Sequence, residues 1–164
     1  MDRKAVIDIG TNSIKLYVAE RASDGSLTSV VDKNNIARLG EGMGDTGILQ
    51  PEAIARNAQA VAEFAGLARD SGAQEIVAVG TMALRTAKNA ADFVSVVQNL
   101  SGVDVRVIPG EEEAGLAYLA VLSGIGASAG RLAVCDVGGG STEFIFGGDA
   151  GVDRRFSINL GAVK

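Results

Sequence analysis

The sequence contains no histidine among its 164 residues, and this absence excludes several kinds of active site. Catalytic Ser-His-Asp and Cys-His arrangements need an imidazole as general base. Acid-base chemistry would then depend on carboxylates, lysine or tyrosine. The single cysteine, Cys135, cannot form an internal disulfide, and its apolar neighbours predict a small core residue rather than a nucleophile.

Positive charge is also scarce. The net charge of −5 and the isoelectric point near 4.7 argue against a surface for nucleic acid, which is held largely by clustered Lys and Arg. The chain does not open with a basic and apolar leader, and its long uncharged stretch, residues 114–130, is rich in glycine and serine. We therefore expect a cytoplasmic protein with no membrane span and no nucleic-acid partner. Such a protein would hold an anionic ligand through a few cations, backbone amides or a metal.

The order of apolar runs and turns predicts an α/β fold. Three short strands, at 4–9, 14–20 and 27–37, are separated by turns and form an antiparallel meander. A helix from Pro51 to Asp70 follows a glycine-rich loop. Strand and helix then alternate, with predicted elements at 74–81, 92–100, 103–108 and 110–124. This alternation implies parallel strands covered by helices.

The chain then repeats its own opening. Residues 131–137 and 142–148 are predicted strands around a glycine turn, and a further strand follows at 152–160. The segments VIDIGTNSIKLYV and VCDVGGGSTEFIF share the frame apolar-x-Asp-apolar-Gly-x-x-Ser. The frame aligns Asp8 with Asp136, Gly10 with Gly138, and Ser13 with Ser141. Such a duplication is typical of a protein with two pseudo-symmetric lobes.

The two glycine turns have the chemistry of phosphate-binding loops. Glycines let a ligand approach the main chain, whose amides then donate hydrogen bonds, and Ser or Thr adds a hydroxyl donor. Neither turn is a Walker or Rossmann loop, and the helix after the G-x-G-x-x-G at 42–47 begins too late for that motif. A plain β-turn is the alternative for each hairpin taken alone. Beside the second turn, Asp136 and Glu143 offer oxygens suited to Mg²⁺, although Glu143 also fits a solvated strand face.

Five segments resemble successive signatures of the Ppx/GppA family of exopolyphosphatases and guanosine pentaphosphate phosphatases. They are AVIDIGTNSIKLYV, TMALRTAKN, VIPGEEEAGLAYLAV, DVGGGSTEF and SINLGAVK. The family belongs to the superfamily of actin, sugar kinases and heat-shock-chaperone ATPases. The resemblance implies a ribonuclease H-like (actin-like ATPase) lobe with a mixed five-stranded sheet and flanking helices over residues 1–126. The first strands of a second, similar lobe would follow over 127–164.

The resemblance implies a Mg²⁺-dependent hydrolase that releases terminal phosphate from inorganic polyphosphate or guanosine pentaphosphate, in a cleft between the lobes. Arg85, otherwise read as a surface arginine, would contact a phosphate. Glu113, with Glu112 as the next choice, would activate the attacking water, and Asp136 and Glu143 would bind Mg²⁺ directly or through water. The other implied phosphate-binding residues are Asp8, Gly10, Thr11, Asn12, Ser13, Gly138, Gly139, Gly140, Ser141 and Thr142.

Helical geometry gives some independent support for two of the acids. On a helical wheel, Glu112 and Glu113 lie near Leu116. The same side carries Leu119 and Ala120, so this side is predicted to face inward. The alternative is that acids in a first helical turn only interact favourably with the helix dipole.

Two features depart from the family's pattern. The chain ends after the first strands of the second lobe, so we expect a piece of a longer enzyme, which leaves the activity of this piece alone open. Gly115 stands where many relatives have a basic or longer residue. Two other classes also fit the residues: an ATPase or sugar kinase of the same superfamily, and a non-catalytic sensor of polyphosphate or guanosine polyphosphates. The formation of a homodimer is also left open.

Overall fold

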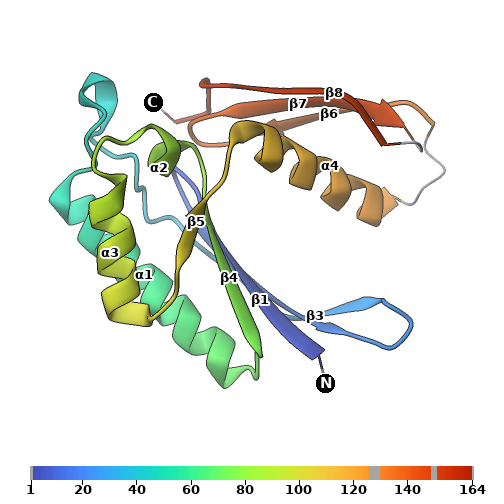
Figure 1. Ribbon diagram of the computed structural model, residues 1–164, viewed down its shortest axis with the longest axis horizontal. Coiled ribbons are helices and arrows are strands. Elements are labelled where there is room, and N and C mark those ends of the chain that lie inside the picture. Colours follow the sequence, from blue (N-terminus) through green and yellow to red (C-terminus); the bar gives the residue numbers. More distant parts are fainter. Residues whose placement is uncertain (1, 126–129, 149–150, 164) are drawn as a thin grey trace. The chain divides into compact units, whose positions relative to one another are not determined.

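The computed structural model describes residues 2–125, 130–148 and 151–163 (Figure 1). The chain divides into two compact units, Met1–Val107 and Ile108–Lys164. The elements of the first unit are β1 (Asp2–Ile9), β2 (Ile14–Arg21), β3 (Leu27–Asn35), the 3₁₀ turn η1 (Gly44–Thr46), α1 (Pro51–Asp70), β4 (Glu75–Gly80), α2 (Met82–Thr86), α3 (Ala90–Ser101) and β5 (Val105–Val107). Those of the second unit are α4 (Gly110–Ile125), β6 (Leu132–Val137), β7 (Thr142–Gly148) and β8 (Gly151–Ile158).

The first unit is built on a mixed five-stranded sheet in the order β3-β2-β1-β4-β5. β1, β2 and β3 form the expected antiparallel meander. β4 and β5 join it as parallel strands, each reached through a helical connection. The predicted mixed sheet with flanking helices is therefore confirmed.

Strand alternation sets which face of this sheet is buried. In β1, Ala5, Ile7 and Ile9 are fully buried, and the residues between them point to the other face. Helices α1 and α3 pack on each other and cover the buried face (Figure 1). Asp8 alternates with Ile7 and Ile9, so it lies on the face opposite this core.

The second unit is a three-stranded antiparallel sheet, in the order β6-β7-β8, covered on one face by α4. Ala114 and Tyr118 of α4 are buried against Ile145 of β7. The Tyr118 hydroxyl also donates to the carbonyl of Gly148 at 3.2 Å. Odd-numbered residues of β7, such as Ile145, therefore face the helix.

The predicted helices and strands are present in the structure, with differences at their ends, and one observed helix was not predicted. The helix from Pro51 to Asp70 has the predicted bounds, whereas the short helix α2 was not predicted. The division into units places α4 with β6–β8, while the sequence had assigned this helix to the first lobe. The predicted lobe boundary, between residues 126 and 127, lies outside the described residues.

Two predictions about the second unit are wrong. Cys135 is exposed rather than part of the core, because it alternates with Val134 and so lies on the face of β6 that α4 does not cover. The inward side of α4 is the Ala114 and Tyr118 side, whereas Leu116 and Leu119 are 48% and 61% exposed. Among the described helices, none has the length and apolar character that a membrane crossing requires.

Candidate functional site

The first glycine turn closes the hairpin between β1 and β2. It consists of Gly10–Ser13, and the Gly10 amide donates to the Ser13 carbonyl at 2.9 Å. A Cβ on Gly10 would stand 3.0 Å from that carbonyl oxygen, so a bare residue fits this position best. The predicted phosphate-binding residues at 10–13 thus form one tight, half-buried turn.

The chain that follows β3 braces this turn from outside. The Arg38 amide donates to the Asn12 carbonyl at 2.8 Å, and the Gly40 amide donates to the Thr11 carbonyl at 2.9 Å. A Cβ on Gly40 would meet the methyl group of Thr11 at 2.5 Å, so this approach also depends on glycine. Both bonds fix the main chain of the turn.

Helix α1 holds the bracing segment in place. Nε of Arg56 and Nδ2 of Asn57 both donate to the carbonyl of Ala37 at 2.8 Å. Among the described residues, Arg38 alone combines a side chain with a positive φ, at 51°. Such a conformation costs of order 1–3 kcal/mol and persists only where the surroundings enforce it, as these bonds do here.

The second glycine turn repeats the geometry of the first. Gly138–Ser141 joins β6 to β7, and the Gly138 amide donates to the Ser141 carbonyl at 2.9 Å. A Cβ on Gly138 would stand 3.2 Å from the same carbonyl oxygen. Asp136 precedes this turn at the spacing by which Asp8 precedes the first. The duplication seen in the sequence is therefore present in the hydrogen bonding.

The second turn is also braced, although by a different set of bonds, and this feature was not predicted. Two amides beyond β8 donate to carbonyls of the turn at 2.9 Å, from Ala162 to Gly138 and from Val163 to Gly139. The bracing segments contain Leu39–Gly40 in the first unit and Leu160–Gly161 in the second. This repeated Leu-Gly pair is the sequence signal that could have revealed both braces.

Thr142 serves the second brace with its side chain. Its hydroxyl donates to the carbonyl of Leu160 at 2.5 Å, and the residue is buried. The hydroxyl proton is thus engaged within the protein. Ser141, also buried, ends the turn beside it.

Arg85 lies in the first unit, on the short helix α2. This helix starts next to the first turn, because the Thr81 amide donates to the carbonyl of Ile9, the last residue of β1, at 3.2 Å. Arg85 follows one helical turn later, and its amide donates to the Thr81 carbonyl at 2.9 Å. Arg85 is half-buried, so the reading as a plain surface arginine does not fit.

Asp136 and Glu143 are directly opposite each other in β6 and β7, so both side chains lie on the face that α4 covers. Glu143 is only 1% exposed, which excludes the reading as a solvated strand face. Ser157 of β8 is the next residue across the sheet, and its hydroxyl donates to Oε1 of Glu143 at 2.7 Å. Asp136 is exposed.

This pair fits a magnesium ion that is shared with a substrate. Facing residues of antiparallel strands have Cβ atoms about 4.5–5.5 Å apart, so two carboxylates can reach one ion. Mg²⁺ keeps several waters and is often bound by one or two carboxylates together with substrate phosphates. Among the described residues, no group of three or more His, Cys, Asp or Glu side chains could hold a metal ion.

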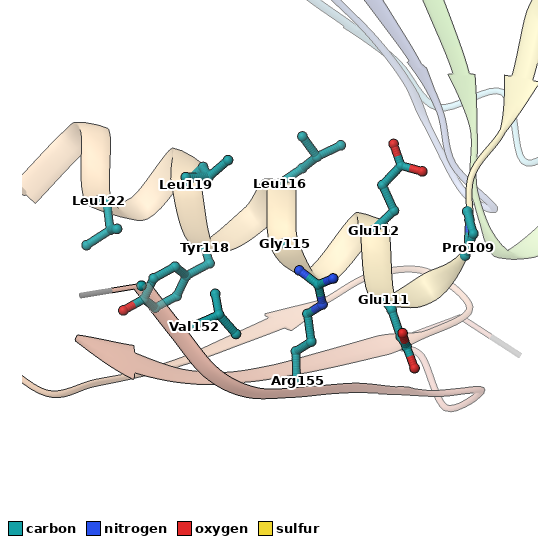
Figure 2. A pocket seen from close by; sticks show the side chains of 11 residues that line it. Pro109, Glu111, Glu112, Gly115, Leu116, Tyr118, Leu119, Leu122, Val152 and Arg155 are labelled. Carbon is teal, nitrogen blue, oxygen red and sulfur yellow. The ribbon is translucent and has the colours of Figure 1, made fainter. Parts of the chain in front are cut away.

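The acids of α4 stand at the start of the helix, where the amides of Glu112 and Glu113 both donate to the Pro109 carbonyl at 3.0 Å. Glu112 and Glu113 are half-buried and Glu111 is exposed. Residues of α4 and β8 line a cavity of 730 Å³, and Glu111 and Glu112 are among them (Figure 2). Figure 2 shows Glu111 on the side of α4 that faces the strands and Glu112 on the side turned away from them.

The predicted site residues therefore form two groups, one in each unit. The first unit brings together the turn at 10–13 and Arg85, with Asp8 on the same hairpin. The second unit contains the turn at 138–141, the facing pair Asp136 and Glu143, and the acids at the start of α4. Each group has one glycine turn and at least one charged side chain in the same unit.

Comparison with known proteins identifies what this arrangement is similar to. Residues 17–164 match the model of the Ppx/GppA phosphatase family. Exopolyphosphatase 1 of Mycobacterium tuberculosis is 34% identical over 160 residues, which are 98% of this chain and 46% of that protein. The chain thus spans about half the length of the curated relatives it matches.

Solved structures give the same result for the fold. An exopolyphosphatase from Cytophaga hutchinsonii superposes with a TM-score of 0.93 at 28% identity, covering 98% of this chain and 51% of that one. The Ppx/GppA family member of Aquifex aeolicus superposes with a TM-score of 0.85 at 37% identity, covering 98% and 52%. EutJ of Carboxydothermus hydrogenoformans, at 16% identity and a TM-score of 0.56, shares the fold alone.

Proposed function

From the premise that this chain belongs to the Ppx/GppA phosphatase family, we propose that it supplies the phosphate-binding and catalytic groups of a Mg²⁺-dependent phosphohydrolase. The substrate would be inorganic polyphosphate or the 5′-phosphate chain of guanosine pentaphosphate, from which terminal phosphate is released. The relatives named as exopolyphosphatases support the first of these substrates. The unit that contains α4 would carry the water-activating group.

One observation carries the proposal. The second unit, a sheet covered by one helix, contains three features together. They are a braced glycine turn, a pair of facing carboxylates and a helix that starts with three acids. Phosphoryl transfer requires few other groups, because its catalysis depends on the positioning of the reactants and on electrostatic stabilisation of the transition state. The second turn alone would fit a plain hairpin, but burial of the Glu143 carboxylate beside it is costly unless that carboxylate is paired or binds a metal.

The mechanism we propose is in-line attack of water on the terminal phosphorus. The Glu113 carboxylate, or that of Glu112, takes the proton of this water as the new P–O bond forms. The bond from that phosphorus to the bridging oxygen breaks, and the shortened phosphate chain leaves with the electron pair. Within the second unit, amides of the turn at 138–141 hold oxygens of the phosphoryl group that is attacked. Within the first unit, amides of the turn at 10–13 and the Arg85 guanidinium bind phosphate oxygens of the substrate chain.

Asp136 and Glu143 would hold the magnesium ion in this scheme. When bound, Mg²⁺ supplies positive charge to phosphate oxygens and so stabilises the charge that develops during transfer. Glu143 is oriented for this task by the Ser157 hydroxyl, which donates to one of its oxygens and leaves the other for the ion. Asp136 is the more accessible partner, so it would contact the ion directly or through water.

The test is Mg²⁺-dependent phosphate release by the naturally encoded protein. We expect release from long-chain polyphosphate, from guanosine pentaphosphate or from both, and no release from ATP. A protein that binds polyphosphate but releases no phosphate would contradict the hydrolase and leave a sensor. Release from ATP in preference to polyphosphate would instead favour the ATPase class.

Ser157 provides a graded test of the metal site. Ser157→Ala removes the hydroxyl that orients Glu143, and loss of such an outer-shell partner typically weakens metal affinity or activity about 10- to 100-fold. We expect the Mg²⁺ concentration for half-maximal activity to rise by about tenfold, with the maximal rate largely restored at high Mg²⁺. An unchanged Mg²⁺ titration would contradict the assignment of Glu143 as a ligand. Ser123→Ala, at an exposed hydroxyl of α4, is the matched control.

A further inference from the structure

Arg155 of β8 reaches the backbone of α4 because residue 115 is a glycine. The arginine lines the 730 Å³ cavity together with Gly115, Glu111 and Glu112. A Cβ on Gly115 would lie 2.8 Å from Nη1 of Arg155, closer than real contacts allow. Figure 2 shows the guanidinium rising from the strand to the helix beside Gly115. The bare helix position therefore makes room for this cation.

The strand register places Arg155 on the same face as the proposed magnesium ligands. Ser157 pairs with Glu143, and Arg155 pairs with Ile145, which is buried under α4. Arg155 is thus a diagonal neighbour of Glu143, and such neighbours lie about 7–8 Å apart at their backbones. Asp136 continues the row of Ser157 and Glu143 across the sheet. The cation and the carboxylates belong to adjacent rows of one face.

The surroundings of Arg155 differ from those of its neighbour in sequence. Arg154 points to the opposite face of β8, where its guanidinium stands 5.5 Å from the centre of the Phe156 ring. Within the part of the chain that the structure describes, the Arg155 guanidinium has no hydrogen bond or ion pair. It carries five N–H donors and is the one cation among the residues that line the cavity.

We propose that Arg155 is a phosphate-binding residue, which contacts non-bridging oxygens of the polyphosphate chain beside the phosphoryl group that is attacked. This inference rests on the proposed function and adds a residue to its site. A guanidinium suits the task, because its planar fork can donate two parallel hydrogen bonds to one phosphate. It also offsets the charge of Glu111 and Glu112, which would otherwise repel a polyanion from this cavity.

The first test compares Arg155→Met with Arg154→Met in the naturally encoded protein. Both variants remove one positive charge from the same strand, but from opposite faces. We expect Arg155→Met to weaken binding of tripolyphosphate, measured by calorimetry without Mg²⁺, and to raise KM about 10- to 100-fold, as for a lost charge-assisted pair. Arg154→Met should change both quantities less than about twofold. Equal losses in the two variants, or no loss in Arg155→Met, would overturn the inference.

Gly115→Ala gives a second test that keeps the charge. The added methyl group displaces the guanidinium, while alanine favours the helix, so stability should not fall. We expect weaker tripolyphosphate binding, and no further loss when Gly115→Ala is added to Arg155→Met. If the losses of tripolyphosphate binding in the two single variants add up in the double variant, Gly115 does not act through Arg155.

The outcomes also separate this inference from the proposed function. Binding that depends on Arg155 in a protein that releases no phosphate would support the inference while the hydrolase fails. Phosphate release with an unchanged KM in Arg155→Met would overturn the inference alone.

Discussion

Glu113→Gln is expected to lower phosphate release about 10²- to 10⁴-fold, which is the usual contribution of a positioned general base. Glutamine cannot take a proton from water, so the general base is lost. Because glutamine has the shape of glutamate, the start of α4 should remain intact. The Glu113 amide bond to the Pro109 carbonyl does not involve the side chain. Binding of polyphosphate should not weaken, because the change removes a negative charge that repels a polyanion. Single-turnover release and calorimetric binding, measured together, would separate the two effects.

The neighbouring acids provide the controls for this prediction. Glu111 is exposed and lines the cavity as a charge without a proposed role in proton transfer, so Glu111→Gln should retain activity within a few-fold. Glu112 is half-buried like Glu113, and it lines the cavity that contains Arg155. If Glu112→Gln loses activity and Glu113→Gln keeps it, the base is Glu112 and our first choice is wrong. Full activity in both would remove the acids of α4 from the mechanism.

Much of the fold was predictable because its signals are local. The alternation in β1 and the proline at the start of α1 each determine an element without reference to the rest of the chain. The duplication of the two hairpins was equally visible, since the Asp, Gly and Ser spacing survives in both copies. Helix α2 has only five residues, too few for a periodic pattern, and it was missed for that reason.

Burial in the second unit was harder to predict. Helix α4 is apolar on more than one side, so periodicity could not tell the Tyr118 side from the Leu116 side. Cys135 lies in an apolar run, but only the position of α4 decides which alternate residues of β6 are covered. Both errors come from the assumption that an apolar residue is buried. Most buried residues are apolar, but many apolar residues are exposed.

The candidate site, like the fold, was predictable only in part. The glycine turns and their acids were predicted from residue type, because close approach of a phosphate requires bare backbone. The contacts of Ser157 with Glu143 and of Arg155 with Gly115 join residues distant in the sequence, so spacing could not reveal them. Gly115 had been noted as a departure from the family's pattern, and the structure relates that departure to the approach of Arg155.

Gly161→Ala is expected to have the second largest effect, through the backbone of the second turn. A Cβ on Gly161 would overlap the carbonyl of Gly139 and the amide of Gly140, and neither group can rotate away. The bracing bonds from Ala162 and Val163 would then break or shift, and the turn with them. We expect a loss of stability of about 1–3 kcal/mol, as in other overpacked sites. Tripolyphosphate binding should weaken at least tenfold, because two or more amides are displaced.

Two other glycines make this prediction specific. Gly40→Ala, at the equivalent brace of the first turn, meets only the methyl group of Thr11, so its effect should be smaller. Gly124→Ala in α4 has no atom within 4 Å of the added group and should leave binding unchanged, with stability equal or higher. Thermal unfolding and tripolyphosphate calorimetry of the three variants give the order directly. If Gly161→Ala binds as well as Gly124→Ala, the second turn does not hold phosphate through its main chain, because that main chain cannot keep its position beside a methyl group at residue 161.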